Sequence, residues 1–185
     1  MGYLKYVKKL FQKPTEESGA LVKQRMIQWR AEPVTVRIER PTRIDRARAL
    51  GYKPKPGVVI VRQRVTRGGH TRPDIKGGRR PSRFHQTKNL DKNYQWIAEE
   101  RASRAYPNCA VLGSYQAGQD GQHAWFEVLL IDRAHPAVLA HAPYLGIAAQ
   151  RGRSERGLTS AGRKARGLRR KGMGAEKVRP SSRLR

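Results

Sequence analysis

The first third of the chain switches between helical and extended patterns of apolar residues. Helical spacing predicts one helix over about residues 3–12 and a second, capped by Thr15, over about 16–30. The segment VTVRIER then alternates with period two and predicts a half-buried strand. A short helix follows in TRIDRARALGY, with Thr42 as its expected cap and Gly51 just past its end.

The middle of the chain contains a strand, an unpatterned basic stretch and a further helix. VVIVRQRV is apolar for four residues and then alternates, which predicts a strand that leaves the core for a charged surface. Residues 66–90 have no period and are crowded with glycine, proline and arginine, so we expect a long basic loop. LDKNYQWIAEERASRAY predicts a helix with Asp91 as its cap and an ion pair between Glu100 and Arg104.

The next segment predicts a hairpin. CAVLGSYQ and WFEVLLID flank the glycine-containing AGQDGQHA, which suits an antiparallel connection. Neighbouring strand residues face opposite ways, so one of Trp125 and Phe126 should enter the core while the other covers the second face of the sheet or meets a partner. Pro136 opens a short helix toward Leu139, and regular apolar spacing fades after Ile147.

Together these elements predict an α+β fold. We expect a two-layer core with a small, mainly antiparallel four-stranded sheet, preceded by two N-terminal helices. The expected division is N-terminal helices in residues 1–33, an α+β core with the basic loop 66–90 in residues 34–137, and an extended basic C-terminal region in residues 138–185.

Charge is distributed unevenly along this architecture. The chain has 40 Lys+Arg against 14 Asp+Glu, a formal net charge of +26. Residues 1–92 carry 24 basic and 7 acidic side chains, residues 93–150 carry 3 and 5, and residues 151–185 carry 13 and 2. Arginine outnumbers lysine by 27 to 13, and its planar fork suits bidentate contacts with phosphate. The composition therefore indicates a polyanionic partner, nucleic acid in particular.

The sequence holds no arrangement of reactive side chains that favours an enzyme. The histidines show no HExxH spacing and Cys109 is the only cysteine, so we expect no metal site, no disulfide and no cofactor. Glu99 and Glu100 point in different directions on a helix, and the paired glycines lack the nucleotide-loop pattern. No apolar run approaches the roughly 18 residues that span a bilayer, so we expect no membrane partner and a cytoplasmic location.

The candidate RNA-binding residues lie in the basic loop and the C-terminal tract. Glycine lets backbone approach a phosphate, and tracts with so few apolar residues become ordered only on binding. The candidates in the loop are Arg67, His70, Arg72, Lys76, Arg79, Arg80 and Arg83. Those in the C-terminal tract are Arg163, Lys164, Arg166, Arg169, Arg170, Lys171, Lys177 and Arg179.

Three separated segments carry a resemblance to a known family. They are ERPTRIDRARALGYKPKPGVVIVRQRVTRGG, AEERASRAYPNCAVLGSYQAGQDGQHAWFEVLLIDRAHPAV and RGLTSAGRKARGL. In this order they resemble the archaeal and eukaryotic large ribosomal subunit proteins called L fifteen e, and the ending GAEKVRPSSRLR is closer to archaeal members. The resemblance implies an α+β core with an antiparallel sheet whose basic extensions enter ribosomal RNA.

The resemblance and the charge distribution together predict a structural clamp in the large ribosomal subunit. The folded core would position two basic arms that neutralise phosphates where RNA helices converge, beside neighbouring large-subunit proteins. A-form RNA hides its base edges, so contacts should go mainly to phosphate and 2′-hydroxyl groups. The alternatives are a DNA-compacting or nucleocapsid-type protein, which would share the charge, and a free RNA-remodelling factor.

Overall fold

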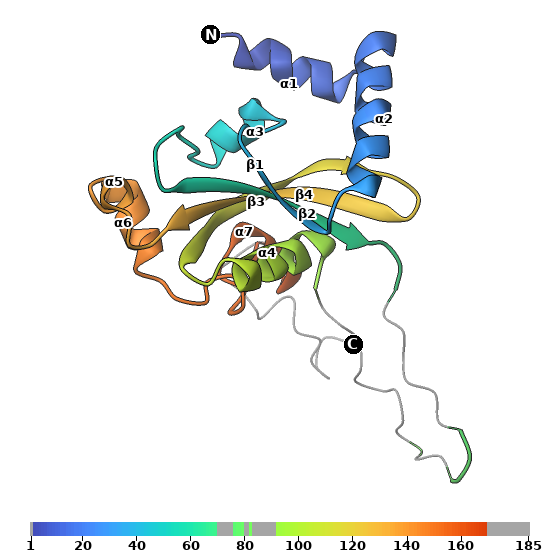
Figure 1. Ribbon diagram of the computed structural model, residues 1–185. Helices are drawn as coiled ribbons and strands as arrows, with labels where there is room; N and C mark the ends of the chain where they lie inside the picture. The colour runs from blue at the N-terminus through green and yellow to red at the C-terminus, as the bar shows by residue number, and fades with distance from the viewer. Residues whose placement is uncertain (1, 70–75, 80–81, 83–91, 170–185) are drawn as a thin grey trace.

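An antiparallel sheet lies at the centre of the computed structural model, which describes residues 2–69, 76–79, 82 and 92–169 (Figure 1). Its strands are β1 (Thr35–Ile38), β2 (Val58–Thr66), β3 (Cys109–Gln119) and β4 (His123–Asp132), in the spatial order β1-β2-β4-β3. Every neighbouring pair is antiparallel. The predicted α+β class and four-stranded antiparallel sheet are therefore confirmed.

Seven helices among the described residues surround this sheet (Figure 1). The predicted pair of N-terminal helices is present, and the elements up to α5 follow the predicted order. In chain order the helices are α1 (Leu4–Gln12), α2 (Glu16–Ala31), α3 (Ile44–Ala49), α4 (Tyr94–Ala105), α5 (Pro136–Leu139), α6 (Ala142–Ala148) and α7 (Ser160–Ala165).

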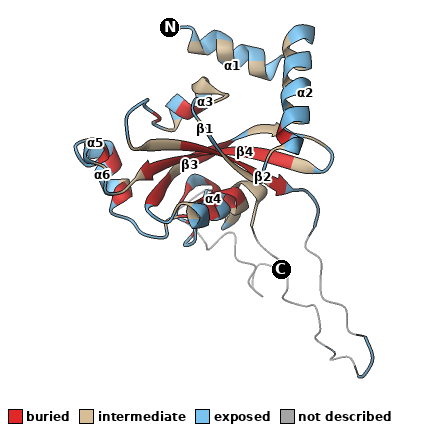
Figure 2. Ribbon diagram, in the orientation of Figure 1, coloured by how far each residue is buried: buried red, intermediate tan, exposed pale blue. Residues whose placement is uncertain are grey.

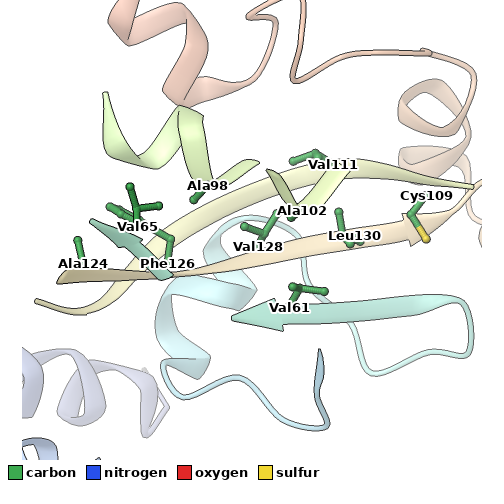
Figure 3. Close-up of a cluster of buried hydrophobic side chains, with 10 residues drawn as sticks. All are labelled: Val61, Val65, Ala98, Ala102, Cys109, Val111, Ala124, Phe126, Val128 and Leu130. Atoms are coloured by element: carbon green, nitrogen blue, oxygen red, sulfur yellow. The ribbon is translucent and has the colours of Figure 1, made fainter. Parts of the chain in front are cut away.

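Helices cover both faces of the sheet. On one face, Ala98 and Ala102 of α4 pack against strand residues that include Phe126 (Figure 3). On the other face, Ala47 of α3 packs against a cluster that includes Leu129. The two-layer expectation is thereby corrected, because WFEVLLI is a nearly continuous apolar run, which is typical of a strand buried on both sides. Figure 2 shows burial concentrated in β4 and its neighbours, whereas α1 and α2 are mostly exposed.

Trp125 and Phe126 lie on opposite faces of β4, as their adjacency predicts. Phe126 belongs to the cluster beneath α4. Trp125 is covered on the other side by Trp29 of α2, with ring centroids 5.9 Å apart. This contact anchors the last turn of α2 on the sheet through Trp29, which is the one buried residue of that helix.

β2 differs from its predicted exit toward a charged surface. Arg62 is only 9% exposed and Gln63 only 1%. The Arg62 guanidinium donates to the Glu32 carboxylate at 2.5 Å and lies 4.6 Å from the centre of the Trp29 ring. An arginine can be buried here because both its charge and its flat surface find partners.

Two helix caps differ from the predicted residues. α4 begins after Asn93, whose side chain accepts a hydrogen bond from the Trp96 N–H at 2.7 Å, and not after Asp91. α3 begins after Arg43 without a side-chain cap, while the Thr42 N–H donates to the buried Glu127 carboxylate at 2.9 Å. In both cases a tertiary contact accompanies the difference, because the Asn93 amide also donates to the Ala161 carbonyl and the Thr42 N–H is taken by Glu127.

The described part of the C-terminal region folds onto the core, although the sequence pattern indicated an extended chain. In α6, Tyr144 and Ala148 pack against Ala110 and Ile131 of the sheet. Turns over residues 151–157 then lead to α7. No apolar period marks this segment, because its close contacts use small and hydroxyl-bearing residues. The rest of that region, residues 170–185, lies outside the described residues.

Gly162 provides a test of this close packing. A Cβ at Gly162 of α7 would lie 2.6 Å from the Gly157 Cα, whereas a Cβ at Gly146 of α6 would meet nothing within 4 Å. We expect Gly162→Ala to lower the free energy of unfolding by about 1–3 kcal/mol through overpacking. The matched change Gly146→Ala should raise it by up to about 1 kcal/mol through helix propensity. Urea unfolding of both variants measures these changes. Equal effects of the two substitutions on the free energy of unfolding would contradict the close packing at Gly162.

Candidate nucleic-acid interface

The predicted RNA-binding residues that the structure describes are all exposed side chains. They are Arg67, Lys76, Arg79, Arg163, Lys164, Arg166 and Arg169. The remaining candidates, His70, Arg72, Arg80, Arg83, Arg170, Lys171, Lys177 and Arg179, lie outside the described residues. A contact between any of these residues and RNA stays a prediction.

The basic loop begins at a fixed point on the core. The Arg67 N–H donates to the Gln122 carbonyl at 2.8 Å, and the Arg67 guanidinium donates to the Asp120 carbonyl at 2.5 Å. Gly68 is tied to α4, because its N–H donates to the Tyr94 hydroxyl at 2.9 Å and its carbonyl accepts from that hydroxyl at 2.8 Å. The first residues of the loop therefore have a defined position relative to the β3–β4 turn and to α4.

α4 also holds the C-terminal segment. The Trp96 indole N–H donates to the Ser154 carbonyl at 2.5 Å, and the Asn93 amide donates to the Ala161 carbonyl at 3.1 Å. Gly157 lies against the Trp96 ring, where an added Cβ would come within 3.0 Å, and it has a positive φ of 63°. Only glycine meets both conditions without strain. The start of α7 is thus fixed by the same helix that holds the start of the loop.

A buried carboxylate completes this junction. Glu99 of α4 is fully buried and accepts hydrogen bonds from the hydroxyls of Ser114 in β3 and Thr159 before α7. Thr159 in turn caps α7, since its side chain accepts from the Gly162 N–H at 3.2 Å. Burial raises the pKa of Glu99 above its usual value, although the two hydroxyl bonds and the charge of Arg153 act in the opposite direction.

Side chains satisfy the exposed edge of β3. Arg153 donates to the carbonyls of Val111 and Leu112 at 2.9 and 3.2 Å. The Gln95 amide donates to the Ser114 carbonyl at 2.9 Å. Edge strands present unpaired backbone groups, and these contacts occupy several of them. Arg153 therefore has a structural use, in contrast to the exposed cations of α7.

α7 and the residues after it bring cations next to those of α3. Lys164 and Arg169 line a cleft together with Arg43 and Arg46. Neither Arg43 nor Arg46 is among the residues that the sequence predicts to bind RNA. The basic run RIDRAR shows that these residues are cationic, but the sequence of a short basic helix does not show which distant segment it faces. Arg166 is not one of the residues that line this cleft. Its guanidinium donates instead to the Gly157 carbonyl at 3.3 Å.

The described residues meet neither the requirements of a metal site nor those of a membrane-spanning helix. Within the described ranges, no three His, Cys, Asp or Glu side chains lie close enough together to hold a metal ion. None of the described helices is both long enough and apolar enough to cross a bilayer. Glu100, adjacent to Glu99, forms ion pairs with Lys92 at 2.6 Å and with Arg104 at 4.0 Å, and the latter is the predicted pair.

A small α+β domain that fixes the starts of two basic segments and exposes cations beside them is typical of a nucleic-acid-binding protein. Comparison with known proteins narrows this broad class of nucleic-acid-binding proteins to one family. Residues 2–185 match the family model described as Ribosomal L15. The chain is also 55% identical to the large ribosomal subunit protein eL15 of Nanoarchaeum equitans, over 99% of this chain and 97% of that relative. The chain belongs to this ribosomal protein family, which confirms the resemblance.

Glu99 leads to a prediction on pH dependence. A folded-state pKa raised above the unfolded value of about 4.5 gives stability that is complete below that value and is lost as pH rises through the folded pKa. Relative to Glu99→Gln, the wild-type chain should therefore lose stability as pH rises above 4.5, by up to about 1.4 kcal/mol per pH unit within that window.

Urea unfolding of the full chain from pH 4 to 8 measures this difference. The exposed carboxylate Glu17 provides the matched control Glu17→Gln, which reports what the loss of one negative charge does to so basic a protein. A stability difference between wild type and Glu99→Gln that stays constant, or that shifts in favour of the wild type as pH rises, would contradict the prediction.

Proposed function

We propose that this chain is a structural constituent of the large ribosomal subunit, where it binds large-subunit ribosomal RNA. Membership of the Ribosomal L15 family over residues 2–185 is the observation that carries the proposal. The name of the 55% identical relative, a large ribosomal subunit protein, supports the same assignment. The net charge of +26 supplies the physical basis for binding a polyanion.

The proposed mechanism is electrostatic clamping from a rigid base. α4 and the β3–β4 turn hold the starts of the basic loop and of the C-terminal segment, so both basic segments begin at fixed points on the core. Each cation that replaces a counterion at a phosphate adds affinity, because the released ion gains entropy. Contacts go chiefly to phosphates and 2′-hydroxyls, which are accessible along A-form RNA.

The same proposal specifies the surroundings of the protein. Its partners are large-subunit ribosomal RNA and neighbouring large-subunit proteins, and its location is the ribosome in the cytoplasm. The protein has no catalytic role in this proposal and needs no cofactor. Its contribution is to hold RNA segments together during and after assembly of the subunit.

Sedimentation of cell extract tests the proposal against its alternatives. We expect the chain, followed by mass spectrometry, to stay with the large subunit after a high-salt wash. A free RNA-remodelling factor would remain near the top of the gradient. A DNA-compacting protein would bind duplex DNA as tightly as a large-subunit RNA fragment when both are measured at one fixed salt concentration. Either outcome would contradict the proposal.

The C-terminal cations lead to a prediction on salt dependence. The triple variant Arg166→Gln, Arg169→Gln and Arg170→Gln removes three charges while keeping polar side chains. If each arginine contacts a phosphate, the slope of log affinity against log salt should fall by about two to three units. Binding of the full chain to a large-subunit RNA fragment, measured from low to moderate salt, gives this slope.

The matched control changes the same three arginines to lysine. It keeps the charge, so its salt slope should equal that of the wild type even if the loss of bidentate geometry lowers affinity. Weaker binding of the glutamine variant at an unchanged slope would mean that these arginines stack on bases or read base edges. No change in either quantity would exclude this segment from the clamp.

A further inference from the structure

A cleft of about 440 Å³ lies between α3, β3 and the segment around α7. Arg43 and Arg46 line it from α3, and Lys164 and Arg169 line it from α7 and the turn that follows. These two groups of cations are separated by more than a hundred residues of sequence. Folding of the chain and docking of the C-terminal segment are therefore both required to form the cleft.

The walls of the cleft are positively charged. Four of its described lining residues are lysine or arginine, and none of them is aspartate or glutamate. Arg43 is already engaged, since it donates to Asp45 at 3.2 Å and lies 4.5 Å from the centre of the Phe11 ring. Within the described part of the chain, Arg46, Lys164 and Arg169 take part in no ion pair. Such a concentration of like charge favours an anion between the walls.

The floor of the cleft carries polar groups in fixed positions. The Gln95 amide, which lines it, donates to the Ser114 carbonyl at 2.9 Å and to the Ser114 hydroxyl at 3.0 Å. The Gln116 amide donates to the Gln119 side chain at 2.7 Å. Tyr115 provides the one aromatic ring among the described lining residues, and it is buried with its hydroxyl bonded to Glu127. The cleft therefore suits phosphates and hydroxyls, and it offers no exposed ring for a base to stack on.

We propose that this cleft binds the phosphates and ribose hydroxyls of a single-stranded turn of RNA, an inference that rests on the proposed function. The volume falls within the range of about 300–1,000 Å³ typical of small-ligand sites, so one or two nucleotides fit and a duplex does not. Arg46 on one wall and Lys164 and Arg169 on the other neutralise the strand from both sides. The bound strand thus connects α3 with the start of the C-terminal tail.

The test compares two double variants that each remove one arginine and one lysine. Arg46→Gln with Lys164→Gln changes the cleft, whereas Lys23→Gln with Arg25→Gln changes exposed cations of α2 outside it. All four side chains are exposed, so both variants should melt like the wild type. The probe is a large-subunit RNA fragment in which individual phosphates are ethylated, so that binding of the full chain reveals which phosphates it needs.

We expect the cleft variant to lose interference at one to three consecutive phosphates of an unpaired segment and to bind on the order of tenfold more weakly. The α2 variant should keep that interference. Equal loss of affinity in both variants with no phosphate-specific change would overturn the cleft site. So would an acidic peptide that binds the wild type but not the cleft variant and leaves the RNA bound, because the cleft would then be a peptide site. Failure of the wild-type chain itself to bind the RNA would instead contradict the proposed function.

Discussion

The buried contact between Glu99 and Thr159 joins the sheet to the segment that carries α7. Glu99 reaches β3 through Ser114 and the C-terminal segment through Thr159, and Thr159 caps α7. Loss of either donor would leave one oxygen of this buried carboxyl group without a hydrogen-bond partner, which is costly in a protein interior. The position of every exposed cation on α7 therefore depends on a hydrogen-bonded group that is itself inaccessible to any partner.

The arginines of this protein divide into two groups by what their guanidinium groups contact. Arg62 and Arg153 are largely withdrawn from solvent and bind a carboxylate, an indole ring or strand carbonyls. Arg46, Arg163 and Arg169 are exposed. Loss of an arginine from the first group should lower stability, and loss of one from the second should lower the salt dependence of binding. High net charge alone does not identify which arginines bind RNA.

Periodicity was sufficient to locate most of the core. The strands and helices α1, α2 and α4 each have a run or period of apolar residues, so local sequence predicts them. The docking of residues 151–165 depends instead on Gly157 and Gly162 approaching backbone and ring, and on single hydrogen bonds from Trp96 and Asn93. Such contacts leave no periodic pattern of apolar residues in the sequence. The two covered faces of the sheet were missed because α3 is too short to show an apolar face.

The candidate RNA-binding site, like the fold, has one part that local sequence predicts and one part that depends on tertiary contacts. Clusters of arginine and glycine predict which segments are cationic, because composition is a local property. The juxtaposition of Arg46 with Lys164 is a tertiary property, and it requires the C-terminal segment to be docked. Docking also has an energetic consequence. Ordering a chain costs about 1–2 kcal/mol per backbone residue, and residues 151–165 have met that cost before any RNA arrives. Binding energy from the cations of α7 can therefore appear as affinity, which makes a folded start of the tail more effective than an equally charged flexible one.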